Sequence, residues 1–471
     1  MSSSTASSVQ IRHHRLRTGT AFAATAAVIA AAAWMTPRTI DRSKAPPPRP
    51  SQGTALLSAR LASSHLLAGE REAFVAVTMK APELAARARP PASVAIVLDT
   101  SGSMGDEQRL ENAKAAAYSL LDRLGPDDEL ALVTYSTAAE LIVPLTLATS
   151  DARLQARRAI AGMTPTGGTN ISGGLGLGAD ALVRAHTSLR RIVLISDGEP
   201  TEGLGAGIVV DPQPLLDFAG RRAAEGTSIT AVGVGLTFRE DIMAGIASAG
   251  RGNYYFVERA ADLTAMFTAE LGRLGETVLT SGELALRPGA DVELLEAIGY
   301  PLIQDADGWR VPVADMRRGE QRKVVLRVRV HASRATQDIV SVTWRYRTLA
   351  GEAQSQVAVA RATVTSDPAA VERGRDPGAL ELIEQARTAR AIDDASAAFA
   401  RGDASAADAI LEQRRTVMQG YAGKMDRKTL DDIQRATGQA ERDFAEAPAA
   451  SAPAGLRAVK GNRAASYELA H

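Results

Sequence analysis

Cysteine is absent from the 471-residue chain. A chain without thiols cannot form disulfides, thiolate zinc sites or iron–sulfur clusters, and it has no thiol nucleophile. Histidine is also scarce, and the six residues are scattered without a recognisable catalytic or metal-binding motif. Neither sign of charge is in excess, since 54 Lys and Arg residues balance 54 Asp and Glu residues. This balance argues against a chain-wide basic surface for nucleic acid. Any metal site must therefore be built from oxygen ligands.

The N-terminal region has the composition of a membrane or export segment. Residues 1–17 end in a basic flank, and residues 18–37 form an uncharged, alanine-rich run. Twenty helical residues cover about 30 Å, the thickness of a hydrocarbon core. We expect a signal-anchor, because Trp34 and Met35 extend the run, with a cleaved signal peptide as the alternative.

The basic flank predicts the orientation of this segment. By the positive-inside rule it stays in the cytoplasm. The bulk of the chain is then periplasmic or otherwise extracytoplasmic, anchored to the inner membrane or secreted after signal cleavage. Residues 38–53 contain the sequence APPPRP and read as a stiff, extended linker.

Between Ser93 and about Gly275, short apolar runs alternate with helical stretches. Continuous apolar runs indicate strands that are buried on both faces, as in a parallel sheet. The expected strands are 94–98, 129–135, 191–196 and 228–235. The expected helices are 106–124, 150–161, 171–185, 212–225, 238–249 and 260–274. This order predicts a doubly wound α/β domain with a mostly parallel sheet.

The sequence on either side of this domain has the period-2 pattern of strands with one buried face. Residues 55–62 and 72–79 are strand-like, and alternation returns from Val278 to Val364. We expect one antiparallel β-sandwich into which the α/β domain is inserted. Its alternating arginines, Arg327, Arg329, Arg345 and Arg347, are interpreted as the solvated side of a sheet rather than as an anion-binding face.

A helical segment follows Pro368. Helices are expected over 379–401, 405–420 and 428–445, with Gly402 ending the first of them. The Ala/Pro-rich residues 446–471 are predicted to be disordered.

Oxygen-bearing side chains gather where the strands of the α/β domain end. Asp99 closes the apolar run VAIVL and is followed by Ser101 and Ser103, in the sequence DTSGSM. Thr169 lies in the loop TPTGGTN before a helix, and Asp197 follows the run RIVLIS. Ligands of doubly wound sheets bind at the carboxyl ends of the strands. Two carboxylates and three hydroxyls are hard donors that suit Mg²⁺, with Mn²⁺ or Ca²⁺ as alternatives, and disfavour zinc or copper.

These three loops resemble the metal-ion-dependent adhesion site of von Willebrand factor type A domains. The family's DxSxS pattern matches Asp99, Ser101 and Ser103, and its later Thr and Asp match Thr169 and Asp197. The resemblance covers about residues 91–275 and implies a binding module without enzymatic activity. The flanks are similar to bacterial proteins related to inter-alpha-trypsin inhibitor heavy chains.

The resemblance also implies a mode of binding. In this family an Asp or Glu of a protein partner typically fills the open position on the metal. Some bacterial members instead work beside AAA+ ATPases in the maturation of other complexes, which would need a cytoplasmic domain.

Two enzymatic interpretations are not favoured. The sequence GGLGLGAD (173–180) imitates a dinucleotide fingerprint but follows a loop rather than a strand, so its glycines are interpreted as helix-packing residues. An aspartyl nucleophile at Asp99 for Mg²⁺-dependent phosphoryl hydrolysis would usually be accompanied by a second carboxylate two residues later, where this chain has Ser101.

The sequence therefore divides into eight parts. They are a basic flank (1–17), a signal-anchor or signal peptide (18–37), a Pro-rich linker (38–53), the first strands of the β domain (54–90), the von Willebrand-like α/β domain (91–275), the rest of the β-sandwich (276–366), a helical segment (376–445) and a disordered tail (446–471).

Overall fold

The computed structural model describes residues 55–83, 90–106, 108–197, 200–207, 210–235, 238–257, 276–306, 308–421 and 423–470. The expected anchor at 18–37, the parts on either side of it up to residue 53, and the expected helix at 260–274 lie outside these ranges. Among the described residues, no helix combines the length and apolar character needed to cross a membrane.

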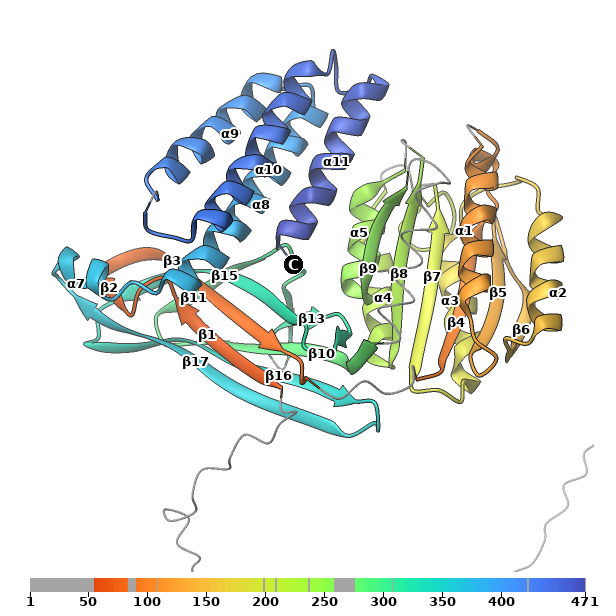
Figure 1. Cartoon of the computed structure of the whole chain (residues 1–471), viewed down its shortest axis with the longest axis horizontal. Helices are drawn as coiled ribbons and strands as arrows, with labels where there is room; N and C mark the ends of the chain where they lie inside the picture. The colour runs from red at the N-terminus through yellow and green to blue at the C-terminus, as the bar shows by residue number, and fades with distance from the viewer. Residues whose placement is uncertain are drawn as a thin grey trace, which may run out of the picture. The chain divides into compact units, whose positions relative to one another are not determined.

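The α/β domain is built on a six-stranded sheet with the order β6-β5-β4-β7-β8-β9 (Figure 1). Five strands are parallel, and the edge strand β6 runs antiparallel to β5. Every residue of the interior strands β4, β5 and β8 is buried, which explains their continuous apolar sequences. The strands are β4 (Ala92–Asp99), β5 (Glu129–Tyr135), β6 (Ala139–Leu147), β7 (Leu189–Ser196), β8 (Thr227–Val234) and β9 (Arg251–Val257).

Helices cover both faces of this sheet, as the alternation of strands and helices predicts. One buried cluster joins the sheet to α1 and α2, and a second joins its other face to α3, α4 and α5. The helices are α1 (Arg109–Arg123), α2 (Ser150–Ala161), α3 (Ile171–Ala181), α4 (Gln213–Ala224) and α5 (Glu240–Ala249). The expected doubly wound architecture is confirmed.

Two glycines of α3 let this helix approach the sheet closely. A Cβ atom at Gly174 would lie 2.6 Å from the ring of Tyr135, and one at Gly178 would lie 2.7 Å from Val97. Any side chain at these positions would clash with the strands. The interpretation of GGLGLGAD as a packing sequence is therefore confirmed.

Two sheets form the β-sandwich, and their strands pair antiparallel except that β2 runs parallel to β17. The first has the order β1-β3-β15-β11 and the second β12-β13-β10-β16-β17-β2, with β14 beside β10. Their inner faces share one buried cluster that includes Val77, Val324 and Trp344. The strands are β1 (Leu56–Leu61), β2 (His65–Leu67), β3 (Gly69–Lys80), β10 (Thr277–Pro288), β11 (Val292–Ile298), β12 (Ile303–Asp305), β13 (Gly308–Val313), β14 (Met316–Arg317), β15 (Gln321–Ala332), β16 (Thr336–Thr348) and β17 (Ala353–Thr365).

The pairing of β3 with β15 makes the α/β domain an insertion. The two strands are in register from Lys80 opposite Gln321 to Gly69 opposite Ala332. They lie on opposite sides of the α/β domain in the sequence, so the sandwich closes only when both ends of that domain return to the same sheet. The expected insertion is confirmed.

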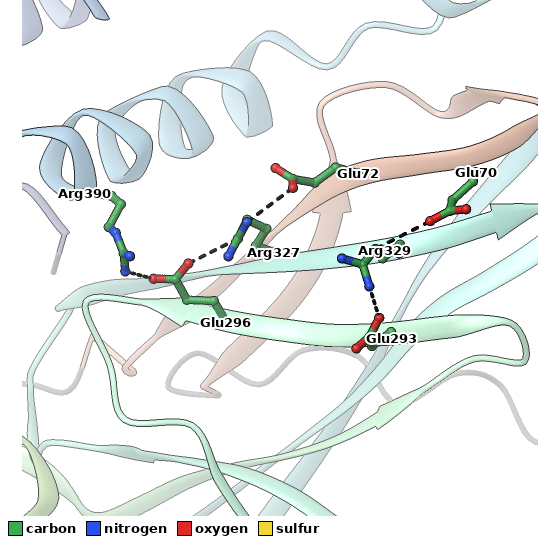
Figure 2. Close-up of polar contacts among 7 residues, drawn as sticks. All are labelled: Glu70, Glu72, Glu293, Glu296, Arg327, Arg329 and Arg390. Carbon is green, nitrogen blue, oxygen red and sulfur yellow. Dashed lines mark hydrogen bonds and ion pairs between the residues drawn. The ribbon is translucent and has the colours of Figure 1, made fainter. Parts of the chain in front are cut away.

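The alternating arginines of β15 are balanced by neighbouring carboxylates on the exposed side of the sheet (Figure 2). Arg327 pairs with Glu72 at 3.3 Å and with Glu296 at 3.2 Å, and Arg329 pairs with Glu70 and Glu293. Exposed pairs of this kind contribute about 0–1 kcal/mol each. The helix α8 (Pro377–Ala400) covers part of this face, because Val325 of β15 is buried in one cluster with Ile383 of that helix. Glu296 also pairs with Arg390 of α8 (Figure 2). The interpretation of a solvated side therefore holds for Arg329, which is half exposed, but not for the whole face.

The C-terminal segment is a bundle of helices that includes the sequence predicted to be disordered. Asp376, Asp403 and Asp426 each accept a hydrogen bond from the first turn of the helix that follows. The helices are α7 (Pro368–Arg373), α8 (Pro377–Ala400), α9 (Ala404–Gln419), α10 (Arg427–Glu446) and α11 (Pro453–Ala470).

The expectation of a disordered tail over 446–471 is wrong for α11. This helix buries Ala458 and Val459, and the hydroxyl of Ser466 donates to the carbonyl of Ala389 in α8 at 2.8 Å. Small residues, which were interpreted as a sign of disorder, instead allow two helices to pack closely.

A cysteine-free chain permits a direct test of the β3–β15 register. Glu72 and Arg329 face each other on the exposed side of the sheet. Facing residues of antiparallel strands have Cα atoms about 4.5–5.5 Å apart, within the range of a disulfide. We expect the double variant Glu72→Cys/Arg329→Cys to form an intramolecular disulfide on oxidation, identified by mass spectrometry of the linked peptides.

The matched control uses the strand on the other side of β15. Glu293 faces Arg329 from β11, so Glu72 and Glu293 are two strand spacings, about 9.6 Å, apart. The variant Glu72→Cys/Glu293→Cys is expected to stay reduced. A disulfide in the control, or none in the test pair, would contradict the register.

Candidate functional site

The ends of two neighbouring parallel strands bring two carboxylates to the same edge of the sheet. Asp99 is the last residue of β4, and Asp197 directly follows β7. These strands pair side by side up to Leu98 opposite Ile195. Both aspartates are buried, with 0% and 2% of their surface exposed. The sequence expectation that these two residues share the carboxyl edge agrees with this placement.

Hydroxyl groups join the two carboxylates into one cluster. The Oδ1 atom of Asp99 accepts from the backbone N–H of Ser101 at 2.8 Å. The hydroxyls of Ser101 and Ser103 are 3.2 Å apart, and Ser103 donates to Oδ1 of Asp197 at 3.0 Å. Ser101 and Ser103 flank the start of a short 3₁₀ turn, Gly102–Gly105, that follows β4. Four of the five predicted site residues thus lie in one hydrogen-bonded cluster.

Thr169 is linked to this cluster through the backbone of its loop. The carbonyl of Gly167 accepts from the N–H of Gly102 at 3.0 Å, and Thr166 donates to the carbonyl of Thr100 at 2.8 Å. Thr169 itself is buried, and its N–H donates to the hydroxyl of Thr201 at 2.7 Å. These bonds tie the loop of Thr169 to the loops that follow β4 and β7.

Three further residues at this edge were not predicted from the sequence. Arg109, the first residue of α1, forms an ion pair with Oδ2 of Asp197 at 2.8 Å. Ser196 donates its hydroxyl to Oδ2 of Asp99 at 2.6 Å. Tyr135 ends β5 next to β4 and is fully buried. Tyr135 and Ser196 could have been found from their positions, because each ends a strand at this edge. The position of Arg109 in the first turn of a helix gives no such signal.

Burial dominates the electrostatics of the cluster. Desolvation raises the pKa of the Asp99 carboxyl to about 6, against the opposing effect of hydrogen bonds from Ser196 and Ser101. The like charge of Asp197 acts in the same direction as burial. Desolvation and the nearby Asp99 carboxylate also raise the pKa of Tyr135 well above its ordinary value. An additional positive charge at this edge would favour the ionised form of Asp99.

The donor set fits a hard divalent cation. It contains two buried carboxylates and three hydroxyls, all oxygen ligands of the kind that Mg²⁺, Mn²⁺ and Ca²⁺ prefer. In the described part of the chain, Asp99 takes part in no ion pair. The same part contains no group of three or more His, Cys, Asp or Glu side chains arranged to hold a metal. A cation at this edge would accordingly depend on the Ser and Thr hydroxyls as well as on the two aspartates.

Comparison with known proteins relates the α/β domain to a family by its sequence and fold. The model of the von Willebrand factor type A domain matches residues 94–199, which contain all five predicted site residues. The uncharacterized protein sll0103 of Synechocystis is 28% identical over 253 residues, which are 53% of this chain and 57% of that protein. Inter-alpha-trypsin inhibitor heavy chain H1 of Bos taurus is 32% identical over 120 residues, 24% of this chain and 13% of that protein. The chain thus spans about half the length of the first relative and a small part of the second.

Among solved structures, the von Willebrand factor type A protein from Catenulispora acidiphila has the same fold over most of the chain. The TM-score is 0.64 at 19% identity, and the match covers 82% of this chain and 90% of that one. The predicted resemblance to von Willebrand factor type A domains, with bacterial relatives and inter-alpha-trypsin inhibitor heavy chains, is confirmed.

The raised pKa of Asp99 predicts a pH-dependent gain in stability for Asp99→Asn. The folded state holds this proton up to pH about 6, whereas the unfolded chain releases it near pH 4. The folded state therefore loses stability as the pH rises from about 4 to about 6, and the full loss is present above pH about 6. In the absence of divalent cations, we expect Asp99→Asn to be more stable than wild type at pH about 7.5, by at most about 3 kcal/mol. Urea unfolding across this pH range measures the difference.

The gain should shrink as the pH falls through about 6 and vanish near pH 4. Asp338→Asn is a suitable control, because Asp338 is exposed and pairs with Arg361 away from this edge. A gain for Asp99→Asn that does not change with pH would contradict the assignment.

Proposed function

Because this chain contains a von Willebrand factor type A domain, we propose that it binds a protein partner through a divalent cation held by Asp99, Ser101, Ser103, Thr169 and Asp197. The observation that carries the proposal is the hydrogen-bonded cluster of buried carboxylates and hydroxyls at the ends of β4 and β7. Mg²⁺ is the proposed ion, with Mn²⁺ or Ca²⁺ as substitutes.

The residues of the cluster would contribute two kinds of oxygen ligand. Asp99 and Asp197 provide negative charge, and Ser101, Ser103 and Thr169 provide neutral oxygens, acting directly or through water. Backbone hydrogen bonds between the three loops hold these groups in place before any ligand arrives, which lowers the entropic cost of binding. A bound cation would supply the positive charge that attracts an Asp or Glu side chain of the partner.

A binding role is favoured over an enzymatic one by the side chains that surround Asp99. An aspartyl phosphoryl-transfer site would usually carry a second carboxylate two residues later, and Ser101 occupies that position and hydrogen-bonds to Ser103. Von Willebrand factor type A domains are generally interaction modules. A broad phosphatase screen with no turnover that depends on Asp99 is the expected result.

The N-terminal sequence supports export of this domain. We propose that residues 18–37 anchor the chain in the inner membrane and that the domains after residue 54 face outward. A reporter active only outside the cytoplasm, fused after Ala45, is expected to be active. A cytoplasmic reporter signal at this position would instead favour a role beside a cytoplasmic AAA+ ATPase.

Substitution of Asp99 tests the metal site itself. We expect wild type to bind Mg²⁺ or Mn²⁺ in isothermal titration calorimetry and Asp99→Ala to lose this binding, because the most buried ligand is removed. Partner capture in Mg²⁺ should be lost with EDTA and in Asp99→Ala, while circular dichroism shows an unchanged fold.

The matched control is Asp338→Ala, which removes an exposed aspartate of the β-sandwich and should leave metal binding unchanged. Partner binding that persists in EDTA and in Asp99→Ala would refute the proposed function.

A further inference from the structure

Arg109 is buried within the cluster and contacts it directly, unlike a flexible side chain on the surface. It is 6% exposed and starts α1, so its backbone is fixed by the helix. One of its guanidinium nitrogens lies 2.8 Å from Oδ2 of Asp197 and 3.4 Å from the carbonyl of Ser103. The stem of the side chain packs against Gly235, which directly follows β8 and has a φ of 87°. Any side chain at Gly235 would crowd Arg109 at 3.1 Å from its Nε atom.

This arginine changes the charge balance of the edge. Among the described buried side chains here, Asp99 and Asp197 are negative and Arg109 is positive, which leaves one net negative charge. A divalent cation would convert this to one net positive charge. A single carboxylate from outside would then make the assembly neutral. Without Arg109, the cation alone would neutralise the two aspartates, and an incoming carboxylate would leave a net negative charge in a buried place, which is unfavourable.

From this charge balance we propose that Arg109 tunes the site in two opposite directions: it weakens the binding of the divalent cation and strengthens the binding of an anionic group to the loaded site. The inference rests on the proposed function and adds to it the reason for a carboxylate-bearing partner. Arg109 touches Asp197 rather than the partner, so it is a positioning and charge-setting residue.

Both effects follow from the position of the guanidinium group. It repels a cation that shares Asp197 with it, and it occupies one oxygen of that carboxylate. The same positive charge attracts an anion that arrives after the cation. A purely structural arginine would weaken both binding steps when removed, since the loops would lose their order. The opposite signs therefore distinguish the two roles.

Arg109→Gln separates these possibilities in the full chain. Calorimetric titration with Mn²⁺ is expected to show a dissociation constant at least about fivefold lower than that of wild type. Acetate, the simplest carboxylate, then serves as the second probe. Acetate displaces water from the Mn²⁺-loaded protein, and water proton relaxation measures this displacement. The Arg109→Gln variant should require at least about fivefold more acetate than wild type. Acetamide, which has a similar shape and no charge, should show no difference between the two proteins.

Two further variants control for charge and for burial. Arg109→Lys keeps the positive charge and is expected to remain close to wild type in both titrations. Arg191→Gln removes an equally buried arginine of the same sheet, which pairs with Asp315 at 2.9 Å near the opposite end of β7, and should leave both titrations unchanged.

The outcomes separate this inference from the proposed function. Failure of wild type to bind Mn²⁺ would overturn both. Binding of Mn²⁺ that needs Asp99 but is unchanged or weakened in Arg109→Gln would overturn the inference alone. If Arg109→Gln is unstable without metal, excess Mn²⁺ should restore its melting temperature, because the cation replaces the lost positive charge. Absence of this rescue would also overturn the inference.

Discussion

Two carboxylates are buried side by side at the ends of β4 and β7, and the cost of keeping them there governs the arrangement of this edge. An ionised carboxylate loses its hydration on burial, and two of them also repel each other. The chain offsets this cost with hydrogen bonds from Ser101 and Ser196 to Asp99, and with the hydroxyl of Ser103 and the Arg109 ion pair at Asp197. The raised pKa of Asp99 shows that the compensation is incomplete. Two buried carboxylates whose desolvation and mutual repulsion are only partly offset form a suitable place for a cation. A positive charge there would lower both of these costs.

The β-sandwich supports this edge from a distance by fixing both ends of the α/β domain. The pairing of β3 with β15 is continuous over their whole length, so the chain must leave and re-enter the same sheet. The two domains also touch directly, since Arg191 at the start of β7 pairs with Asp315 of the sandwich. This contact lies at the end of β7 opposite to Asp197. The carboxyl edge with Asp99 and Asp197 is therefore left to the loops, while the other end of the sheet carries this contact with the sandwich.

The regular parts of the fold could be predicted because their sequences repeat with a clear period. Fully buried strands such as β4 and β5 read as unbroken apolar runs, and β15 reads as strict alternation. The grouping of Asp99, Ser101, Ser103 and Asp197 followed from the rule that parallel strands end at one edge. Arg109 could not be found in this way, because an arginine in the first turn of a helix is ordinarily exposed and only the tertiary structure turns it toward Asp197. The helix α11 was missed because alanine and proline enrichment is shared by disordered tails and by helices that pack through small residues.

The net charge of zero over the whole chain conceals how strongly charge is organised locally. On the sandwich, Arg327 and Arg329 are matched by glutamates on neighbouring strands, and these exposed pairs contribute little energy. At the carboxyl edge of the α/β sheet, three buried charges do not cancel, and each additional charge changes the balance in a medium that screens it poorly. The long-range field of a neutral chain offers little steering toward a partner. Under the proposed function, recognition at this edge would therefore depend on short-range contacts, and the sign of the local charge with a cation bound would decide which chemical group completes the site.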